Sequence, residues 1–501
     1  FEKNPVVICS LGDNSVTEGE VAEAFQFAAL HQLPIIFLVQ DNEWGISVTK
    51  EEARTSDAYD YAAGFVGLNR MRIDGTDFVE SFIQMQKAVH FVREERKPLL
   101  VCAKTVLIGH HTSGVRREFY RDEADLAKHR AKDPGIILKK YLLEEGFSEE
   151  TLSQIEIEAR KQIEEDFNKA ILAPDPKPET VKEHVYAPTP ITEEKGTRIP
   201  ENGEKIPMVD AGIHAIQELM HKHPEALLYG QDVGGRIGGV FREAVTLQQK
   251  FGNKRVFNTA IQEAYIIGST VGMSAVGLKP IVEVQFADYI YPGINQLVTE
   301  VSKSCYLSNG KYPVSSIIRV PIGAYGGGGP YHSGSVETML AQIKGIKIAY
   351  PSNAADFKGL FKAAFYDPNP VIFLEHKGLY WSKVPGTEDA KTVEPAEDYI
   401  LPFGKANIVK FANEEEIQKG RTLVVVTYGM GVYWAKEAAK NFEGRVEIID
   451  LRTIKPIDEE LVFERVKLHG KCILLTEEAL NNSMMEAFGA RISKNCFKYL
   501  D

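Results

Sequence analysis

The sequence lacks the features that would indicate a membrane protein or a disulfide-stabilised protein. It contains no low-complexity tract and no apolar run near the roughly 20 residues that a membrane-spanning helix needs. Its five cysteines are scattered without metal-type spacing, and we interpret them as buried free thiols in a reducing compartment. The net charge of −12 argues against nucleic-acid binding. We therefore expect a cytoplasmic globular protein without a membrane or nucleic-acid partner.

The length and the start of the chain shape the expected domain organisation. A chain of 501 residues suits about three domains of ordinary size. No signal peptide is recognisable at Phe1–Asn4, which leads directly into an apolar strand. Because one strand–helix–strand unit cannot easily close a sheet, we expect the chain to begin inside its first domain.

The stretch from Gly12 to Ser47 organises the first domain. Apolar runs predict buried strands at Val6–Leu11 and Ile35–Val39, and helical spacing predicts a helix at Glu20–His31. A right-handed crossover brings the loops after both strands to the same edge of a parallel sheet. Both loops could be ordinary turns, since Gly-Asp and Asp-Asn are common there.

The polar residues of these two loops also suit a bound cation and a phosphate. Asp13 and Asn42 would offer a carboxylate and an amide oxygen, which are hard ligands preferred by Mg²⁺. Backbone N–H groups near Asn14 and Ser15, at the expected amino end of the helix, would suit phosphate oxygens.

This stretch resembles the thiamine-diphosphate signature, in which Gly-Asp-Gly is followed further on by Asn-Asn. Here Asn14 replaces the second glycine and Asp41 replaces the first asparagine. Thr17-Glu18-Gly19 and the tail Trp44–Ser47 extend the resemblance to the α subunit of the decarboxylating component of 2-oxo acid dehydrogenases. The resemblance implies thiamine diphosphate and Mg²⁺ as cofactors. It implies metal ligands at Asp13, Asn42 and the Trp44 carbonyl, and cofactor contacts at Asn14, Ser15 and Ile46.

A histidine pair follows the next predicted strand, Pro98–Ala103. A pair in a polar loop is usually only solvated, but Ile108–Gly114 resembles the Gly-His-His-Ser-Thr segment of the same family. The resemblance implies that His111 lies near the cofactor phosphates and the incoming lipoyl arm. Thr112 stands where mitochondrial relatives carry a regulatory phosphoserine, so we do not expect that regulation here.

Composition changes after a charged helical segment at residues 135–173. Seven prolines punctuate the following polar stretch, which predicts a semi-rigid extended linker. The expected domains are residues 1–172, the linker 173–207, and domains at 208–385 and 386–501. In relatives with separate subunits the α chain ends near the linker and the β chain begins, so this sequence resembles a fusion of the two.

The second half carries a candidate for activating the cofactor. Glu263 opens a predicted helix that reaches Ala275, where an acidic residue is usually just electrostatically favourable. Resemblance to the β subunit instead implies that Glu263 hydrogen-bonds the cofactor's pyrimidine ring, with Ile261, Gln285 and Tyr289 as further cofactor contacts. It also implies a catalytic role for His332, as for His111. Gln231 stands where the family has a glutamate.

The last domain completes the predicted fold. Strands are expected at Thr422–Thr427, Val446–Asp450 and Cys472–Thr476, and Asp450–Pro456 resembles the carboxyl-terminal domain of transketolase. The predicted class is thus α/β: a thiamine-diphosphate-binding fold of two related parallel-sheet domains plus a transketolase-like carboxyl-terminal domain. The expected metal ligands and Glu263 belong to different domains, so we expect the site at an interface.

The resemblance implies oxidative decarboxylation of a 2-oxo acid and transfer of the acyl group to the lipoyl group of an acyltransferase core. The pair His110-His111 favours a branched-chain substrate such as 2-oxoisovalerate, and we expect a homodimer equivalent to an α₂β₂ heterotetramer. A pyruvate or acetoin dehydrogenase component is one alternative. A transketolase-like carboligase and a catalytically inert fragment or scaffold are others. Lipoyl-dependent acyl transfer would identify the dehydrogenase, and cofactor-dependent heat stabilisation would argue against the inert fragment.

Overall fold

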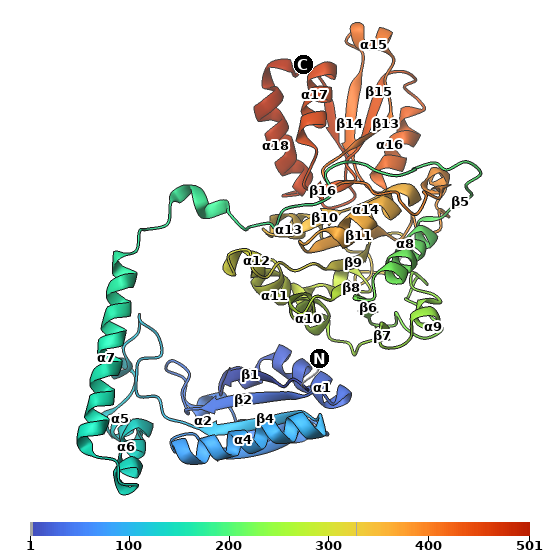
Figure 1. The fold of residues 1–501 in the computed structure, drawn as a ribbon. Helices are drawn as coiled ribbons and strands as arrows, with labels where there is room; N and C mark the ends of the chain where they lie inside the picture. Colours follow the sequence, from blue (N-terminus) through green and yellow to red (C-terminus); the bar gives the residue numbers. More distant parts are fainter. Residues whose placement is uncertain (1–3, 327) are drawn as a thin grey trace. The chain divides into compact units, whose positions relative to one another are not determined.

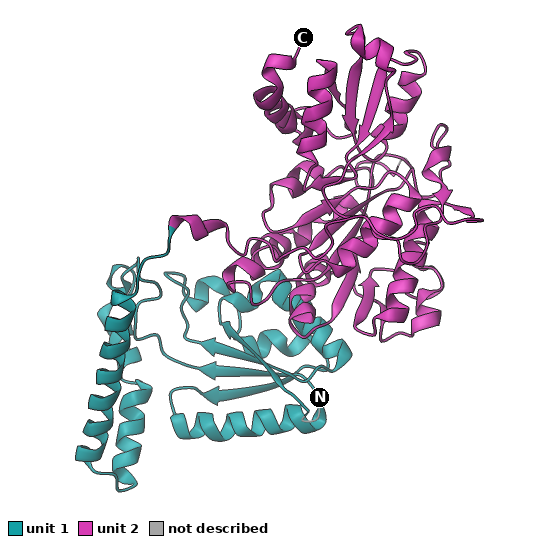
Figure 2. Cartoon of the chain, turned by 45° about the horizontal axis from the view of Figure 1, so that its top comes forward, with its two compact units in different colours: residues 1–177 teal, residues 178–501 magenta. Residues whose placement is uncertain are grey.

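The structure is a computed structural model that describes residues 4–326 and 328–501. It divides into two compact units, residues 1–177 and 178–501, shown in separate colours in Figure 2 and as a labelled ribbon in Figure 1. The expectation placed on Phe1–Lys3 lies outside the described residues, as does Gly327. Each unit is described by itself.

Unit 1 is built on a four-stranded parallel sheet of order β1-β2-β4-β3. Its strands are β1 (Val7–Gly12), β2 (Ile35–Asp41), β3 (Asn69–Asp74) and β4 (Leu99–Lys104). Helix α1 (Gly19–His31) packs Phe25 and Ala28 against one face of the sheet, and α4 (Phe78–Glu95) packs Ala88 and Val92 against the other. Because β1 and β2 are neighbouring and parallel, the loops that follow them share one edge, as the sequence predicted.

The remaining helices of unit 1 include one correction to the sequence analysis. The α-helix begins at Gly19, one residue before its predicted start at Glu20. A short 3₁₀ turn at Ser15–Thr17, with Asn14 as its N-cap, precedes it, so the backbone N–H groups near Asn14 and Ser15 lie at the amino end of this turn and not of α1. The charged segment after residue 133 forms two helices, as expected. The further helices are α2 (Lys50–Ala53), α3 (Ala58–Tyr61), η2 (Ala62–Gly64), η3 (Arg117–Phe119), α5 (Glu123–Arg130), α6 (Pro134–Glu144) and α7 (Glu149–Leu172).

The proline-rich segment is fixed to unit 2 along much of its length. After η4 (Pro178–Lys182), the backbone of Ala187 exchanges two hydrogen bonds with the Asn369 side chain, at 2.7 and 2.9 Å. Further along, Arg198 Nη1 lies 2.7 Å from Asp356 Oδ1, and β5 (Lys205–Ile206) pairs with β12 (Thr392–Val393). Proline keeps this segment out of the main sheets, and side chains of unit 2 satisfy its polar groups.

The main sheet of unit 2 has seven strands in the order β16-β10-β11-β9-β8-β6-β7, with only β16 antiparallel to its neighbour. Its strands are β6 (Ala226–Gly230), β7 (Val256–Asn258), β8 (Lys279–Glu283), β9 (Ile317–Ile322), β10 (Lys347–Ala349), β11 (Val371–His376) and β16 (Thr453–Lys455). Helices α8 (Met208–Lys222) and α14 (Ala354–Tyr366) cover one face. Helices α10 (Glu263–Ala275) and α13 (Glu337–Gln342) cover the other. The smaller helices are α9 (Leu247–Phe251), η5 (Ala287–Tyr289), η6 (Tyr291–Gly293), α11 (Ile294–Gln296), η7 (Leu297–Val301), α12 (Ser304–Leu307) and η8 (Glu388–Ala390).

The carboxyl-terminal part of unit 2 has its own four-stranded sheet, of order β13-β15-β14-β17. Its elements are β13 (Asn407–Lys410), α15 (Glu414–Gln418), β14 (Leu423–Thr427), α16 (Gly431–Ala439), β15 (Val446–Asp450), α17 (Glu459–His469), β17 (Cys472–Leu474), α18 (Met484–Cys496) and η9 (Phe497–Tyr499). The three strands expected from the sequence are present. Among the described residues, no helix is both long and apolar enough to cross a membrane.

Candidate active site

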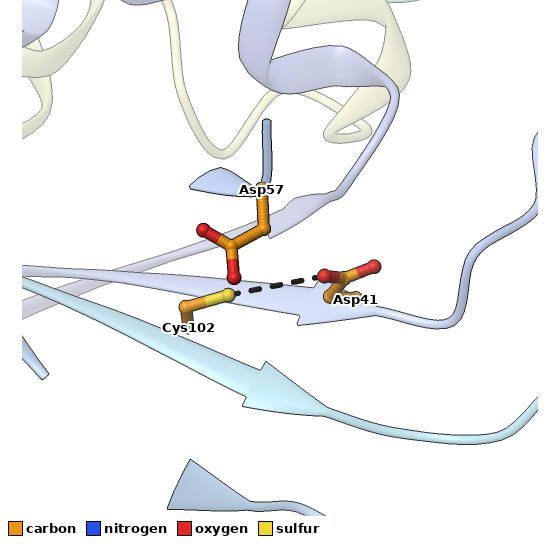
Figure 3. Close-up of side chains that lie close together, drawn as sticks. All are labelled: Asp41, Asp57 and Cys102. Atoms are coloured by element: carbon orange, nitrogen blue, oxygen red, sulfur yellow. Dashed lines mark hydrogen bonds between the residues drawn. The ribbon is translucent and has the colours of Figure 1, made fainter. Parts of the chain in front are cut away.

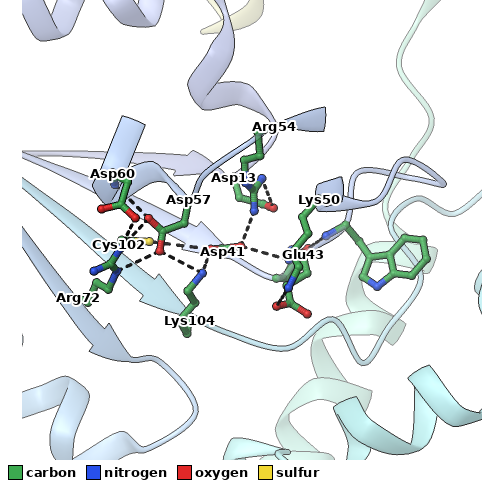
Figure 4. A network of polar contacts seen from close by, with 12 residues as sticks. Asp13, Asp41, Glu43, Lys50, Arg54, Asp57, Asp60, Arg72, Cys102 and Lys104 are labelled. Carbon is green, nitrogen blue, oxygen red and sulfur yellow. Dashed lines mark hydrogen bonds and ion pairs between the residues drawn. The ribbon is translucent and has the colours of Figure 1, made fainter. Parts of the chain in front are cut away.

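In unit 1, Asp13 follows β1 and Asp41 is the last residue of the neighbouring strand β2. The two aspartates lie on either side of one arginine. Asp13 is 3% exposed, and its Oδ2 lies 2.7 Å from Nη1 of Arg54. Nη2 of Arg54 lies 2.7 Å from Asp41 Oδ1, and Nη1 donates to Asn14 Oδ1 at 3.1 Å. Figure 4 shows Arg54 beside the two aspartates. The loops at this sheet edge therefore surround a cation, and that cation is a guanidinium.

A glycine lies where the two loops approach each other closely. The pKa of the Asp13 carboxyl in the first loop is shifted. A Cβ on Gly45 would lie 2.5 Å from the Asn14 side-chain nitrogen, so a larger residue there would require the Asn14 side chain to move. Burial raises the pKa of Asp13 above its ordinary value, although the Arg54 guanidinium opposes that shift. A nearby Asp41 carboxylate adds to the rise through repulsion. Asp13 is thus a carboxylate whose charge is costly unless a cation lies beside it.

The other residues that the sequence assigned to metal and phosphate binding have local partners. Asn42 Oδ1 accepts a hydrogen bond from the Trp44 backbone N–H at 3.0 Å. Ser15 Oγ donates to the Gly12 carbonyl oxygen at 2.7 Å, and Ile46 is exposed. The oxygens of Asp13 and Asn14 converge on one point and fit a cation, whereas the Asn42 amide oxygen is held within its own turn.

A second group in unit 1 has the composition of a metal site. Ligand atoms of Asp41, Asp57 and Cys102 all lie within 4.8 Å of one another (Figure 3). The Lys104 ammonium, however, contacts Asp41 and lies 3.5 Å from Asp57 Oδ2, and Arg72 Nε donates to the same oxygen at 3.0 Å. Burial and the Asp41 charge also raise the pKa of the Cys102 thiol, which keeps it protonated. We interpret the group as a network of ion pairs, drawn in Figure 4.

The predicted histidine loop is exposed and is supported by a buried arginine. His110 Nδ1 accepts the Arg117 backbone N–H at 3.2 Å, and His111 is exposed beside it. Arg121 holds the base of the loop, since its Nη1 donates to the Leu107 carbonyl at 2.7 Å. The Arg121 guanidinium also lies over the Trp44 ring, with 5.1 Å to the ring centre. Through Arg121, the loop that contains His111 is therefore connected to Trp44.

In unit 2, Glu263 and Gln231 form a direct pair at the carboxyl edge of the sheet. Glu263 begins α10 and is buried, and its Oε1 accepts a hydrogen bond from Gln231 Nε2 at 2.8 Å. Gln285 Nε2 donates to Asp232 Oδ2 at 2.6 Å and lies 3.5 Å from the Gln231 carbonyl. Three of the four residues follow strands β6 and β8, which are parallel neighbours. Nearby in sequence, Ile261 is exposed.

Tyr289 and His332 form the second pair predicted for unit 2. The Tyr289 hydroxyl lies 2.7 Å from His332 Nε2, and His332 Nδ1 lies 3.0 Å from the Gly328 carbonyl. A carbonyl can only accept, so Nδ1 carries a proton, and in the tautomer with that proton Nε2 is able to accept from the tyrosine hydroxyl. The Phe286 ring lies edge-on to His332, with 4.5 Å between ring centres. His332 is thereby held with its tautomer defined.

Sequence reasoning missed the cations of unit 1. Arg54, Lys104 and Arg72 belong to no motif, and their partners became visible only when loops far apart in the chain met. One sequence signal was available: an aspartate in place of the first signature asparagine adds a buried negative charge that needs a partner.

Comparison with known proteins identifies related families along the whole chain. Residues 1–179 match the family described as "Dehydrogenase E1 component", 204–382 match "Transketolase, pyrimidine binding domain" and 413–501 match "Transketolase, C-terminal domain". A 2-oxoisovalerate dehydrogenase subunit beta from Bacillus subtilis is 38% identical over 296 residues, 58% of this chain and 86% of that protein. The chain belongs to the thiamine-diphosphate-dependent 2-oxo acid dehydrogenases.

Within this family the chain joins α-subunit-like and β-subunit-like sequences, and the predicted fold class is confirmed. The relatives carry two substrate names. A pyruvate dehydrogenase E1 component subunit beta from Acholeplasma laidlawii is 38% identical and covers 59% of this chain and 86% of its own length. A mitochondrial 2-oxoisovalerate dehydrogenase subunit beta from Dictyostelium discoideum is 37% identical and covers 60% and 77%. This 2-oxo acid dehydrogenase therefore has relatives named for both substrates at similar identity.

Proposed function

We propose that this dehydrogenase decarboxylates a branched-chain 2-oxo acid, of the 2-oxoisovalerate type, and passes the acyl group to a lipoyl group. The observation that carries the catalytic part is the Gln231–Glu263 pair at the start of α10. The match of residues 1–179 to the family described as a dehydrogenase E1 component supports an acyltransferase partner for this chain. The proposed assembly is a homodimer.

The diphosphate end of the cofactor is assigned to unit 1. Asp13, Asn42 and the Trp44 carbonyl would hold Mg²⁺, with Asn14, Ser15, Ile46 and His111 near the cofactor. The buried, perturbed carboxyl of Asp13 supports this assignment, because a cation is needed to stabilise its charge. A metal at Asp13 requires the Arg54 guanidinium, now 2.7 Å from Oδ2, to move away.

The pyrimidine end is assigned to unit 2, with Ile261, Glu263, Gln285 and Tyr289. Thiamine diphosphate, when bound, supplies a nucleophilic thiazolium carbon and an electron sink for decarboxylation. Glu263 would hydrogen-bond a ring nitrogen through its carboxylate, which the Gln231 amide orients by donating to Oε1. His332 would accept a proton at Nε2, the nitrogen that now accepts from Tyr289.

Glu263→Gln tests the catalytic assignment. The amide should leave thiamine-diphosphate affinity within a few-fold of the parent and slow exchange of the thiazolium proton by about 10²- to 10⁴-fold, because a proton-transfer partner is lost. The measurement is deuterium exchange of the bound cofactor by NMR after acid quench. The matched control is Glu415→Gln, an exposed glutamate in the first turn of α15. Exchange in Glu263→Gln as fast as in this control would contradict the assignment.

The substrate preference needs its own comparison. The pair His110-His111 supports a branched-chain substrate, and hydrophobic pockets separate neighbouring alkyl groups by only about 1–3 kcal/mol per methylene. We expect kcat/KM with an artificial electron acceptor to be highest for 2-oxoisovalerate, then 2-oxobutyrate, then pyruvate. A clear preference for pyruvate would overturn the branched-chain assignment and leave the roles of Asp13 and Glu263 untouched.

A further inference from the structure

One guanidinium binds the residues by which this chain departs from the thiamine-diphosphate signature. Arg54 contacts Asp13 through Nη1 at 2.7 Å, and this aspartate is the one that the chain has in common with the signature. It also contacts Asn14 at 3.1 Å and Asp41 at 2.7 Å, and these two residues replace the signature's glycine and first asparagine. Glycine and asparagine at those positions would leave Arg54 a single charged partner among these three residues. The two departures therefore build one guanidinium site.

Burial strengthens the ion pairs that Arg54 makes in this site. The side chains of Arg54, Asp13 and Asp41 are 8%, 4% and 0% exposed, so their ion pairs are poorly screened by water. Lys104 contacts the other oxygen of Asp41, which leaves Arg54 as the cation shared by both aspartates. A guanidinium and a divalent cation on the same carboxylate would repel each other strongly at such distances.

The geometry points to Arg54 as a built-in cation that competes with a divalent metal for Asp13. This inference rests on the proposed function, in which Asp13 is a metal ligand. With Arg54 in place the aspartates are neutralised without a metal, and a metal enters only when the guanidinium leaves. The apparent affinity for the metal is the intrinsic affinity multiplied by the fraction of molecules in which Arg54 has left Asp13.

The surroundings of Arg54 allow the side chain to move. It directly follows α2, a helix of four residues, so few backbone hydrogen bonds restrain it. A cavity of about 280 Å³ adjoins it, lined also by Val16, Thr17, Ser56 and Tyr61. A displaced guanidinium has space there without disturbing the sheet.

The test measures Mn²⁺ alone, without thiamine diphosphate, bound to the full chain by electron paramagnetic resonance. Arg54→Gln should bind Mn²⁺ at least about tenfold more tightly than the parent, since the competing charge is gone. The matched control is Arg130→Gln, which removes an exposed arginine from its Glu123 pair in the same unit and should stay within about twofold. Unchanged or weaker Mn²⁺ binding by Arg54→Gln would overturn the inference.

A second variant keeps Arg54 and guards against misfolding, because Arg54→Gln leaves two buried carboxylates without that partner. The double variant Asn14→Gly/Asp41→Asn removes two of its three contacts and should also bind Mn²⁺ more tightly. If Asp13→Ala, added to either variant, leaves the tight binding intact, the metal is not at Asp13 and the inference fails. Failure of the proposed function is recognised separately, as absence of thiamine-diphosphate binding by the parent at saturating Mg²⁺.

Discussion

Arg54 in unit 1 and Arg319 in unit 2 are each held between two carboxylates, yet the surroundings differ. Arg319 on β9 binds Glu375 through two nitrogens, at 2.7 and 2.8 Å, and lies 3.2 Å from Glu283. All three side chains are buried within the strands of the seven-stranded sheet. Arg54 lies in a loop, and its partners lie at the ends of strands.

The difference shows that the place of an arginine in the fold, more than the chemistry of its partners, decides whether another cation can replace it. The strand hydrogen bonds fix the backbone of Arg319 and its partners, and the guanidinium is buried between them, so it is held in place by the sheet itself. Arg54 lies outside the strands, directly after the four-residue helix α2, and a cavity adjoins it. We therefore regard Arg319 as structural and Arg54 as exchangeable.

Removing the structural arginine should give the largest loss of stability. Arg319→Gln leaves Glu283 and Glu375 buried without their cation, and we expect the free energy of unfolding to fall by about 3–5 kcal/mol. Urea unfolding of the full chain, followed by far-ultraviolet circular dichroism, measures this change. Arg54→Gln is the comparison, and an equal or larger loss there would contradict the distinction between the two arginines.

A buried carboxyl without such a cation should make stability depend on pH. Burial, with repulsion from Glu478, raises the pKa of Glu337 to about 8, and both its oxygens lack a hydrogen-bond partner among the described residues. A raised carboxyl pKa contributes stability that is present below about pH 4.5 and lost as pH rises to about 8.

Between pH 6 and 7 this loss is at most about 1.4 kcal/mol. Unfolding at both pH values should show it in the parent chain and not in Glu337→Gln. An identical pH dependence of the two proteins would show that Glu337 does not titrate in this range.

A new carboxylate beside Glu263 should have a smaller effect, which is measured here in catalysis. Gln231→Glu puts a second acid where an amide now donates at 2.8 Å, and like charges raise the pKa of the pair. Because the proposed role needs ionised Glu263, the acid limb of the kcat/KM profile should move to higher pH by about one unit. Gln231→Met, which removes the amide donor but adds no charge, is the control and should move the limb by less than Gln231→Glu does. Equal profiles for the two variants would argue against a Gln231–Glu263 pair in the working site.

Strands and helices with a local apolar pattern were predicted from the sequence, whereas contacts between residues far apart in the chain were missed. Apolar runs located β1 and β2, and the helix beginning at Glu263 matches α10 residue for residue. The start of α1 was predicted to within one residue, at Glu20 against Gly19, but the 3₁₀ turn at Ser15–Thr17 that separates it from Asn14 was not predicted. Arg54 could not be found from spacing, since its contacts join three segments of the chain.

The central claim is that Asp13 anchors the cofactor in unit 1, and calorimetric titration with thiamine diphosphate and Mg²⁺ tests it most directly. The parent chain should bind the cofactor saturably and only with Mg²⁺ present. Asp13→Ala should abolish this Mg²⁺-dependent binding, because the buried carboxylate is the expected metal ligand. An affinity in Asp13→Ala equal to that of the parent would contradict the account.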